Sequence, residues 1–203
     1  ALVEGLRRRA LWDESLILVT SDHGEEFREH GGFIHVQPYA ESLAVPLLVK
    51  LPRAERGGTR VATTVETVDY LPTLLEAAGL PPPAPIQGRS LLPLARGDAQ
   101  PARPAFGRDK LDRERFALRR GGLTLIHHLG TGRSELYDRV ADPGETLDLG
   151  QRQPELVAAL RAELFEIVAR NRGLAAVLAA APAGADVLTE DETEKLRAIG
   201  YVE

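Results

Sequence analysis

Two short apolar segments constrain the fold of this chain more than any other feature. Residues 15–20 read Ser-Leu-Ile-Leu-Val-Thr, and residues 45–50 read Val-Pro-Leu-Leu-Val-Lys. Runs of this length, rich in branched aliphatic residues and without strict alternation, are typical of strands that are buried on both faces, as in a parallel sheet. Pro46 stands near the start of the second run, where its missing N–H interferes least with strand pairing. The pattern favours an α/β domain whose main sheet contains both segments.

Helical and irregular patterns surround these two strands. The apolar residues of segment 1–11 fit one face of a helix, and residues 40–43 fit a single helical turn. A longer amphipathic helix is predicted to end just before Gly79, because glycine is well suited to the position after a helix C-terminus. Residues 25–37 lack any periodicity, which predicts a long loop. Prolines cluster in residues 79–104, which indicates an irregular crossing segment.

The second half of the chain shows a different pattern. Residues 116–120 and 123–127 are β-prone and are separated by Gly121-Gly122, which predicts a hairpin. Residues 135–138 are a candidate third strand. A helix is predicted from about residue 154 to residue 170, because its leucines and valines recur on one side.

The expected domain organisation follows from this change of pattern. We predict that residues 1–100 belong to the main α/β domain and that residues 101–172 form a small α+β subdomain. Residues 173–203 are predicted to be a tail, mobile or draped on the surface around residues 175–186. Thr189 and Glu192 have the spacing of a capping box, which predicts a short final helix.

The composition excludes several classes of function. The 203 residues include 25 Lys and Arg and 30 Asp and Glu, for a formal net charge of −5. A nucleic-acid or anionic-membrane partner requires clustered basic residues, whereas the arginines here are mixed with acids and are predicted to lie on solvated faces. The chain has no cysteine, so disulfides, thiolate metal sites and cysteine nucleophiles are excluded. No apolar run is long enough to predict a membrane span.

The segment after the first apolar run carries the candidate chemistry. Residues 22–35 contain three of the five histidines, together with Asp22 and three glutamates. They follow the end of a predicted strand, where α/β sheets open a crevice for ligands. Asp22 and His23 are candidate metal ligands, because carboxylate oxygen and imidazole nitrogen both suit divalent cations. The alternative is a capped turn with a surface histidine.

The remaining polar residues of this segment receive weaker assignments. His35 is a candidate cation or proton donor beside an anionic group, and its alternative is a histidine of a surface loop. His30 is a weaker candidate of the same kind. The segment's three glutamates are predicted to be solvated or structural. His127 and His128 lie in the predicted hairpin, one facing the core and one facing solvent, and are predicted to be structural.

Five segments, in order along the chain, together resemble one protein family. They resemble the C-terminal metal-site region of sulfatases within the alkaline phosphatase superfamily. The segments are 18–25 with 29–31 and 45–48, then 67–75 with Ala78-Gly79, then 87–93, then 135–138 with 142–145, and finally 196–201.

The resemblance implies a fold and a reaction. The fold is an alkaline-phosphatase-like α/β sandwich with a small antiparallel four-stranded sheet and a packed helix. The reaction is the hydrolysis of sulfate esters of small molecules or glycans. Two alternatives stay open: a phosphodiester or phosphonate monoester hydrolase of the same superfamily, or a non-catalytic sulfatase-like module. The resemblance also implies a periplasmic or extracellular location.

The resemblance also implies roles for three residues. Asp22 and His23 would complete the shell of a divalent metal, usually calcium, with manganese and zinc as alternatives. His35 would hold the sulfate group or assist the leaving group. The family nucleophile is a formylglycine made from Cys or Ser in a Cys/Ser-x-Pro-x-Arg motif, which this sequence lacks. The chain is therefore expected to be the C-terminal portion of such an enzyme and to be inactive alone.

Overall fold

The computed structural model describes residues 1–109, 115–180 and 194. The chain forms two compact units, Ala1–Val168 and Ala169–Glu203. The predicted final helix after Thr189 lies outside the described residues. In the part of the chain that is described, every helix is either too short or too polar to cross a membrane. The predicted domain boundary near residue 100 stays a prediction.

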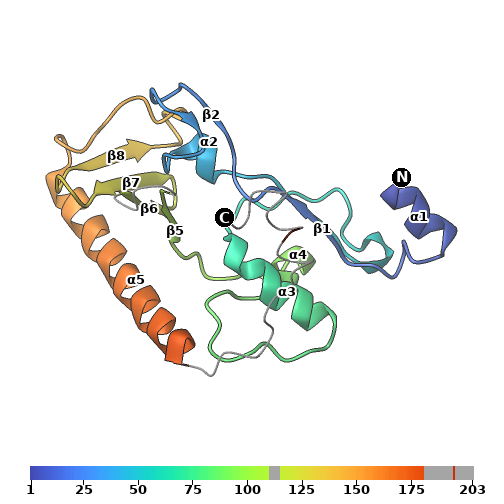
Figure 1. Cartoon of the computed structure of the whole chain (residues 1–203). Helices are drawn as coiled ribbons and strands as arrows, with labels where there is room; N and C mark the ends of the chain where they lie inside the picture. The colour runs from blue at the N-terminus through green and yellow to red at the C-terminus, as the bar shows by residue number, and fades with distance from the viewer. Residues whose placement is uncertain (110–114, 181–193, 195–203) are drawn as a thin grey trace. The chain divides into compact units, whose positions relative to one another are not determined.

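A four-stranded antiparallel sheet is the largest sheet of the first unit (Figure 1). Its order is β5-β6-β7-β8, and the strands are β5 (Ala105–Arg108), β6 (Arg115–Arg120), β7 (Leu123–His128) and β8 (Ser134–Asp138). The predicted hairpin is confirmed, with Arg120 opposite Leu123 and Gly121 in the left-handed region at φ +59°. β5 was not predicted, because its sequence Ala-Phe-Gly-Arg carries little β propensity and depends on pairing with β6.

Helix α5 (Pro154–Ala180) packs against one face of this sheet through its residues up to Val168. Its apolar stripe meets the inward-facing residues of the strands, and Leu164 is completely buried. The resulting core cluster contains Phe116, Leu118, Leu125, Leu136, Leu160, Leu164, Ile167 and Val168. The helix extends beyond the predicted end at residue 170. Residues 175–180, in the predicted tail, are helical, because alanines favour helix.

The two apolar segments form β1 (Ile17–Thr20) and β4 (Leu47–Lys50). They pair with each other antiparallel, with Thr20 opposite Leu47, in a two-stranded sheet. The prediction of parallel strands buried on both faces is wrong within the described residues: the side chains of Val19 and Leu48 are 54% and 62% exposed. The expected mixed α/β architecture is nevertheless present, because these strands alternate with helices along the chain.

Short elements complete the first unit. The predicted loop at 25–37 contains a small hairpin, β2 (Glu26–Phe27) with β3 (Phe33–Ile34). Gly79 follows α3 (Tyr70–Ala77) and its end residue Ala78 with φ +70°, so the predicted glycine after the helix is confirmed. The other elements are α1 (Leu2–Arg8), α2 (Ala40–Leu43), η1 (Pro52–Ala54), η2 (Thr67–Asp69), α3 (Tyr70–Ala77) and α4 (Leu92–Arg96). α1 buries none of its residues.

A buried carboxylate orders the proline-rich segment. Asp69 is fully buried, and its Oδ1 accepts hydrogen bonds from the Arg89 backbone N–H and from the Arg103 guanidinium. Thr73 donates to the Asp69 carbonyl and accepts from the Leu91 N–H. A buried charge needs such partners to offset its lost hydration. The prediction that arginines lie on solvated faces is therefore wrong for Arg103.

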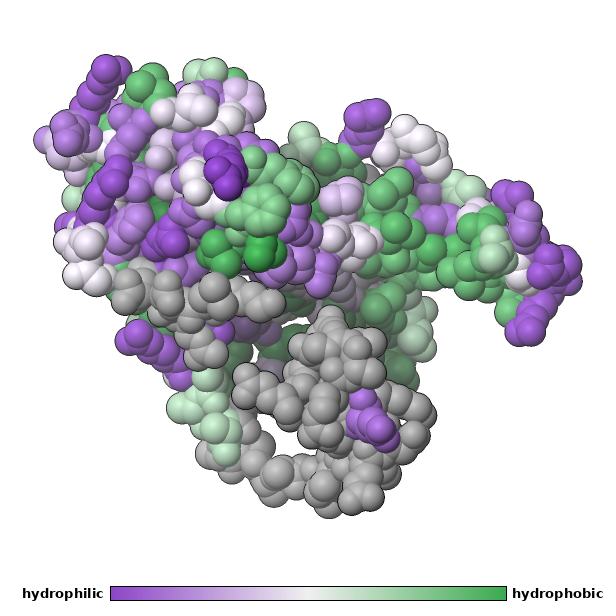
Figure 2. All heavy atoms as spheres, turned by 45° about the horizontal axis from the view of Figure 1, so that its top comes forward, coloured by the Kyte–Doolittle hydropathy of each residue, from purple (hydrophilic) through white to green (hydrophobic). Residues whose placement is uncertain are grey.

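The outer surface is not uniformly polar. Figure 2 shows hydrophobic residues in patches among hydrophilic ones on the face that it presents. Scattered apolar side chains are ordinary on a protein surface, but neighbouring ones indicate contact with another group. Two such neighbours, Phe27 and Phe33, lie on the small hairpin and are more than half exposed.

The core between α5 and the sheet yields a stability prediction. Leu164→Ala should lower the free energy of unfolding by about 2–5 kcal/mol, because it removes buried methyl groups and leaves a cavity. Leu147→Ala is the matched control, since Leu147 is 51% exposed. Urea denaturation of the two variants measures both effects. Equal losses of stability would contradict the described packing.

Candidate functional site

The candidate site begins directly after β1. The backbone N–H of His23 donates to Asp22 Oδ1 over 3.0 Å, which lowers the pKa of the exposed Asp22 carboxyl and keeps it ionised. Asp22 Oδ2 lies 3.5 Å from His23 Nε2. Adjacent residues in a regular strand point to opposite faces, but these two lie past the end of the strand. Their side chains therefore converge.

The tautomer of His23 follows from its neighbours. Its Nδ1 lies 2.8 Å from the Gly24 carbonyl oxygen, which can only accept a hydrogen bond. Nδ1 therefore carries the proton, and in the neutral imidazole Nε2 keeps its lone pair. A histidine ligand commonly has this arrangement, in which a backbone carbonyl orients the ring. The free nitrogen is the one nearest Asp22.

Gly24 fixes the start of the loop against α2. Its N–H donates to the Ser42 carbonyl over 2.8 Å. A Cβ atom at this position would lie 1.8 Å from the Glu41 carbonyl oxygen, so no larger residue fits without moving the backbone.

His35 returns to the same place from the far end of the loop. Its ring stacks on that of His23, with centroids 3.7 Å apart and planes 24° from parallel. Glu25 Oε2 lies 3.7 Å from His35 Nδ1. His23, Glu25 and His35 each offer a ligand atom within 4.8 Å of the others. The structure thus brings His35 onto His23 and adds Glu25, which was predicted to be solvated or structural, whereas Asp22 is not in this group of three and approaches His23 alone.

Buried polar contacts hold the loop between these two ends. Glu26 is fully buried and accepts hydrogen bonds from the Gly32 N–H over 2.7 Å and from Gln37 Nε2 over 3.0 Å. Arg115 of the large sheet in turn donates to Gln37 Oε1. The β2–β3 hairpin is therefore closed around a carboxylate and tied to β6.

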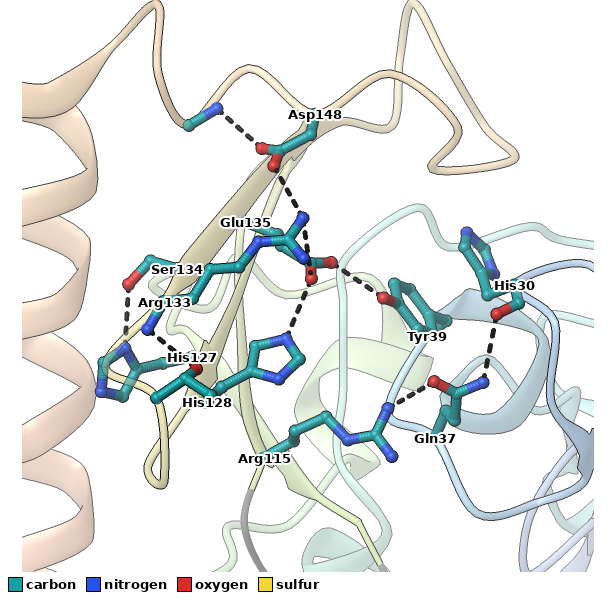
Figure 3. A network of polar contacts seen from close by, with 12 residues as sticks. His30, Gln37, Tyr39, Arg115, His127, His128, Arg133, Ser134, Glu135 and Asp148 are labelled. Atoms are coloured by element: carbon teal, nitrogen blue, oxygen red, sulfur yellow. Dashed lines mark hydrogen bonds and ion pairs between the residues drawn. The ribbon is translucent and has the colours of Figure 1, made fainter.

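Glu135 anchors the next part of the loop to the sheet (Figure 3). Its Oε2 accepts hydrogen bonds from the Tyr39 and Tyr137 hydroxyls over 2.8 and 2.7 Å, and His128 Nε2 lies 2.9 Å from Oε1. Burial alone would raise the pKa of Glu135, but the two hydroxyl donors and nearby cations outweigh it, so the pKa is lowered. Burial and the adjacent carboxylate raise the pKa of both tyrosines, which stay neutral donors.

The two hairpin histidines have different surroundings. His127 is buried, lies 2.9 Å from the Ser134 hydroxyl and packs edge-on against Phe165 of α5. His128 lies on the opposite face of β7, where it contacts Glu135 rather than facing open solvent. The structural assignment fits both residues, but the solvent-facing assignment of His128 is wrong.

Glu145 joins the loop to the sheet most directly. It is fully buried, its Oε2 accepts the Ala40 N–H over 2.8 Å, and its carbonyl lies 2.9 Å from His30 Nε2. Its Oε1 lies 3.7 Å from Arg139 Nε and 4.0 Å from an Arg119 nitrogen. Burial lowers the pKa of Arg119 to about 10, which still leaves this arginine cationic at neutral pH.

A hydrogen-bond acceptor lies next to each of the two ring nitrogens of His30. Nδ1 lies 2.6 Å from Glu41 Oε1, and Nε2 faces the Glu145 carbonyl. Its ring stacks on Tyr39, with centroids 3.7 Å apart. Burial alone would lower the pKa of His30, but these acceptors favour the imidazolium and raise it. His30 therefore fastens the loop and does not converge with the candidate ligands.

Sequence reasoning missed the buried carboxylates. Glu135 and Glu145 lie within the two family-like segments of the subdomain, yet nothing in a single acidic residue distinguishes burial from exposure. The available signal for Glu135 was its place in a strand beside Leu136 and Tyr137, where alternation puts every second side chain on one face.

A family model and the curated relatives point to one family. The family described as N-sulphoglucosamine sulphohydrolase, C-terminal, matches residues 28–170. The chain is 28% identical to human arylsulfatase K over 181 residues, which cover 82% of this chain. It is 30% identical over 165 residues, 73% of this chain, to an N-acetylglucosamine-6-O-sulfatase of Bacteroides thetaiotaomicron. The chain spans about a third of the length of these curated relatives, 33% and 30% respectively.

The solved structure of another protein, in complex with that protein's substrate D-glucosamine-2-N,6-O-disulfate, has the same fold over most of this chain. The superposition has a TM-score of 0.68 at 26% identity and covers 82% of this chain and 36% of that one. The alkaline-phosphatase-like fold expected from the sequence is thereby confirmed for this part of the domain.

The surroundings of His30 yield a pH prediction. Because its folded-state pKa is raised above 6.5, its contribution to stability is fully present below pH 6.5 and is lost as the pH rises through the folded value. Wild type and His30→Gln should therefore differ more in unfolding free energy at pH 5.5 than at pH 8.5. Urea denaturation at both pH values measures this difference. A gap that widens with pH would contradict the assignment.

Proposed function

We propose, from the premise that the chain belongs to the sulfatase family of the alkaline phosphatase superfamily, that it supplies the metal-binding edge of an active site that hydrolyses sulfate esters. The observation that supports this most directly is that His35, from the far end of the loop, stacks on His23, whose Nε2 lies 3.5 Å from the Asp22 carboxylate. A surface loop would not keep such side chains together without support. Here the buried carboxylate of Glu26 and its partners hold the loop in place.

Asp22 and His23 would hold the divalent metal. The ionised carboxylate and the free Nε2 lie on the same side of the backbone, which fits a shared cation. A carboxylate favours calcium, whereas the imidazole also suits manganese or zinc. A bound cation of this kind polarises the ester and orients it for attack. We propose calcium as the physiological ion, following the family resemblance.

His35 would contact the sulfate group itself. Its ring is mostly buried, with 19% of the side chain exposed, and is fixed by the stack on His23 and by Glu25. A donor held in place near an anionic ester stabilises the charge that develops on the leaving oxygen. The nucleophile is proposed to come from residues outside this sequence, because the chain has neither cysteine nor a Ser-x-Pro-x-Arg motif.

The proposed substrate is a sulfated saccharide. One relative is named for N-acetylglucosamine 6-O-sulfate, and the solved structure holds a glucosamine disulfate. With a formal net charge of −5, the chain does not attract a polyanionic saccharide over long range. Binding would therefore depend on contacts with individual residues at the site.

An assay of the intact protein, meaning the enzyme that contains this chain together with the nucleophile segment, tests this function. The enzyme should hydrolyse glucosamine 6-sulfate at least tenfold faster than the matched 6-phosphate. Asp22→Asn should abolish turnover and lower calcium affinity at least tenfold in calorimetric titration, because one charged ligand is lost. Asp98→Asn, at an exposed aspartate outside the loop, is the matched control.

Three outcomes would count against the proposal. Faster turnover of the phosphate ester would favour the phosphoester-hydrolase alternative. Unchanged calcium affinity in Asp22→Asn would remove Asp22 from the metal shell. Absence of turnover with either ester, in a protein that carries the nucleophile motif, would favour a non-catalytic module.

A further inference from the structure

Two exposed phenylalanines face each other on the β2–β3 hairpin. Phe27 and Phe33 occupy opposite positions in the strand register, with rings edge to face and centroids 6.4 Å apart. Their side chains are 66% and 60% exposed. We refer to these two residues as the aromatic ridge. A large aromatic side chain normally gains stability from burial, so folding of the described residues does not explain their positions.

The ridge is held rigidly although it is exposed. Glu26, the first residue of β2, is fully buried and accepts the Gly32 N–H and the Gln37 amide. The Phe27 N–H donates to Glu29 Oε2 over 2.5 Å. A fixed aromatic surface loses little conformational entropy when a ligand binds, which makes it a suitable binding platform.

The ridge is continuous with the candidate site. Glu25 directly precedes β2, and His35 directly follows β3, so both strands of the hairpin start or end at a residue of the site. Arg28 lies next to Phe27, is exposed and has a left-handed backbone at φ +79°. An apolar platform and a cation thus border a site that is proposed to take an anionic ester.

We propose that the aromatic ridge binds the pyranose ring of a sulfated saccharide, with Arg28 beside it as a contact for a second anionic substituent. This inference rests on the proposed function and names the residues that would hold the sugar ring at that site. A pyranose presents an apolar C–H face to the negative face of an aromatic ring and keeps its hydroxyls in water. A saccharide is favoured over a peptide or lipid occupant because the ridge is only two rings wide and lies beside the ester site.

Kinetics of the intact protein test the ridge. Phe27→Leu and Phe33→Leu keep apolar bulk but remove the aromatic faces. Each should raise KM for glucosamine 6-sulfate roughly three- to tenfold, with little change in kcat. Phe165→Leu, on α5, is the aromatic control and should leave KM unchanged. Saturation-transfer NMR with glucosamine 6-sulfate and the 203-residue chain should show transfer from aromatic protons to the ring C–H protons, which is lost in the double variant.

The outcomes separate the ridge from the proposed function. An active enzyme whose KM is unchanged in both variants would overturn the ridge and leave the function standing. Saturation transfer to the 203-residue chain, together with an intact protein that fails to hydrolyse sulfate esters, would leave the ridge standing and overturn the function. Variants that lose thermal stability while KM is unchanged would show that the ridge packs against protein, and this result would also overturn the proposal.

Discussion

The hydrogen bonds of Glu145 are the interaction on which the rest of the site depends. A single buried residue accepts the backbone N–H of Ala40 through its side chain and faces His30 through its carbonyl, more than a hundred residues away in sequence. Leaving a buried carboxylate unpaired would cost several kcal/mol, so the loop and the sheet stabilise each other. Glu26 and Glu135 are also buried carboxylates, and each accepts hydrogen bonds that fix another point of the loop. The candidate ligands can therefore remain exposed while the backbone beneath them is fixed.

The residues that hold the loop in place are different from the residues that are the candidate metal ligands. The carboxylates that position the loop are buried and hydrogen-bonded, whereas Asp22 and His23 are partly or largely exposed. Binding sites work best when their ligands are pre-oriented by such a supporting layer. The sheet and α5 provide the rigid base, since their core is apolar on the side away from the loop.

Much of the fold could be predicted from local sequence. The hairpin at Gly121-Gly122, the strand after it and the glycine that ends α3 follow from turn chemistry and periodicity, which act over a few residues. Residues 22–35 stood out because histidines and acids gather after an apolar run. What local sequence could not show was which acids are buried: Glu26 and Glu145 acquire their partners only when distant segments meet. The burial of β1 and β4 on both faces was wrongly expected for the same reason, because apolar character does not specify a covering layer.

Titration with Mn²⁺, followed by NMR of the five histidines, tests the central claim most directly. A paramagnetic ion broadens resonances in a strongly distance-dependent way, and His127 and His128 provide internal references on the hairpin of the large sheet. The claim predicts that the ring signals of His23 and His35 broaden first, that those of His127 and His128 stay sharp, and that Asp22→Asn weakens the effect. Equal broadening of all five histidines, or none at His23, would contradict the claim that the loop holds a divalent metal.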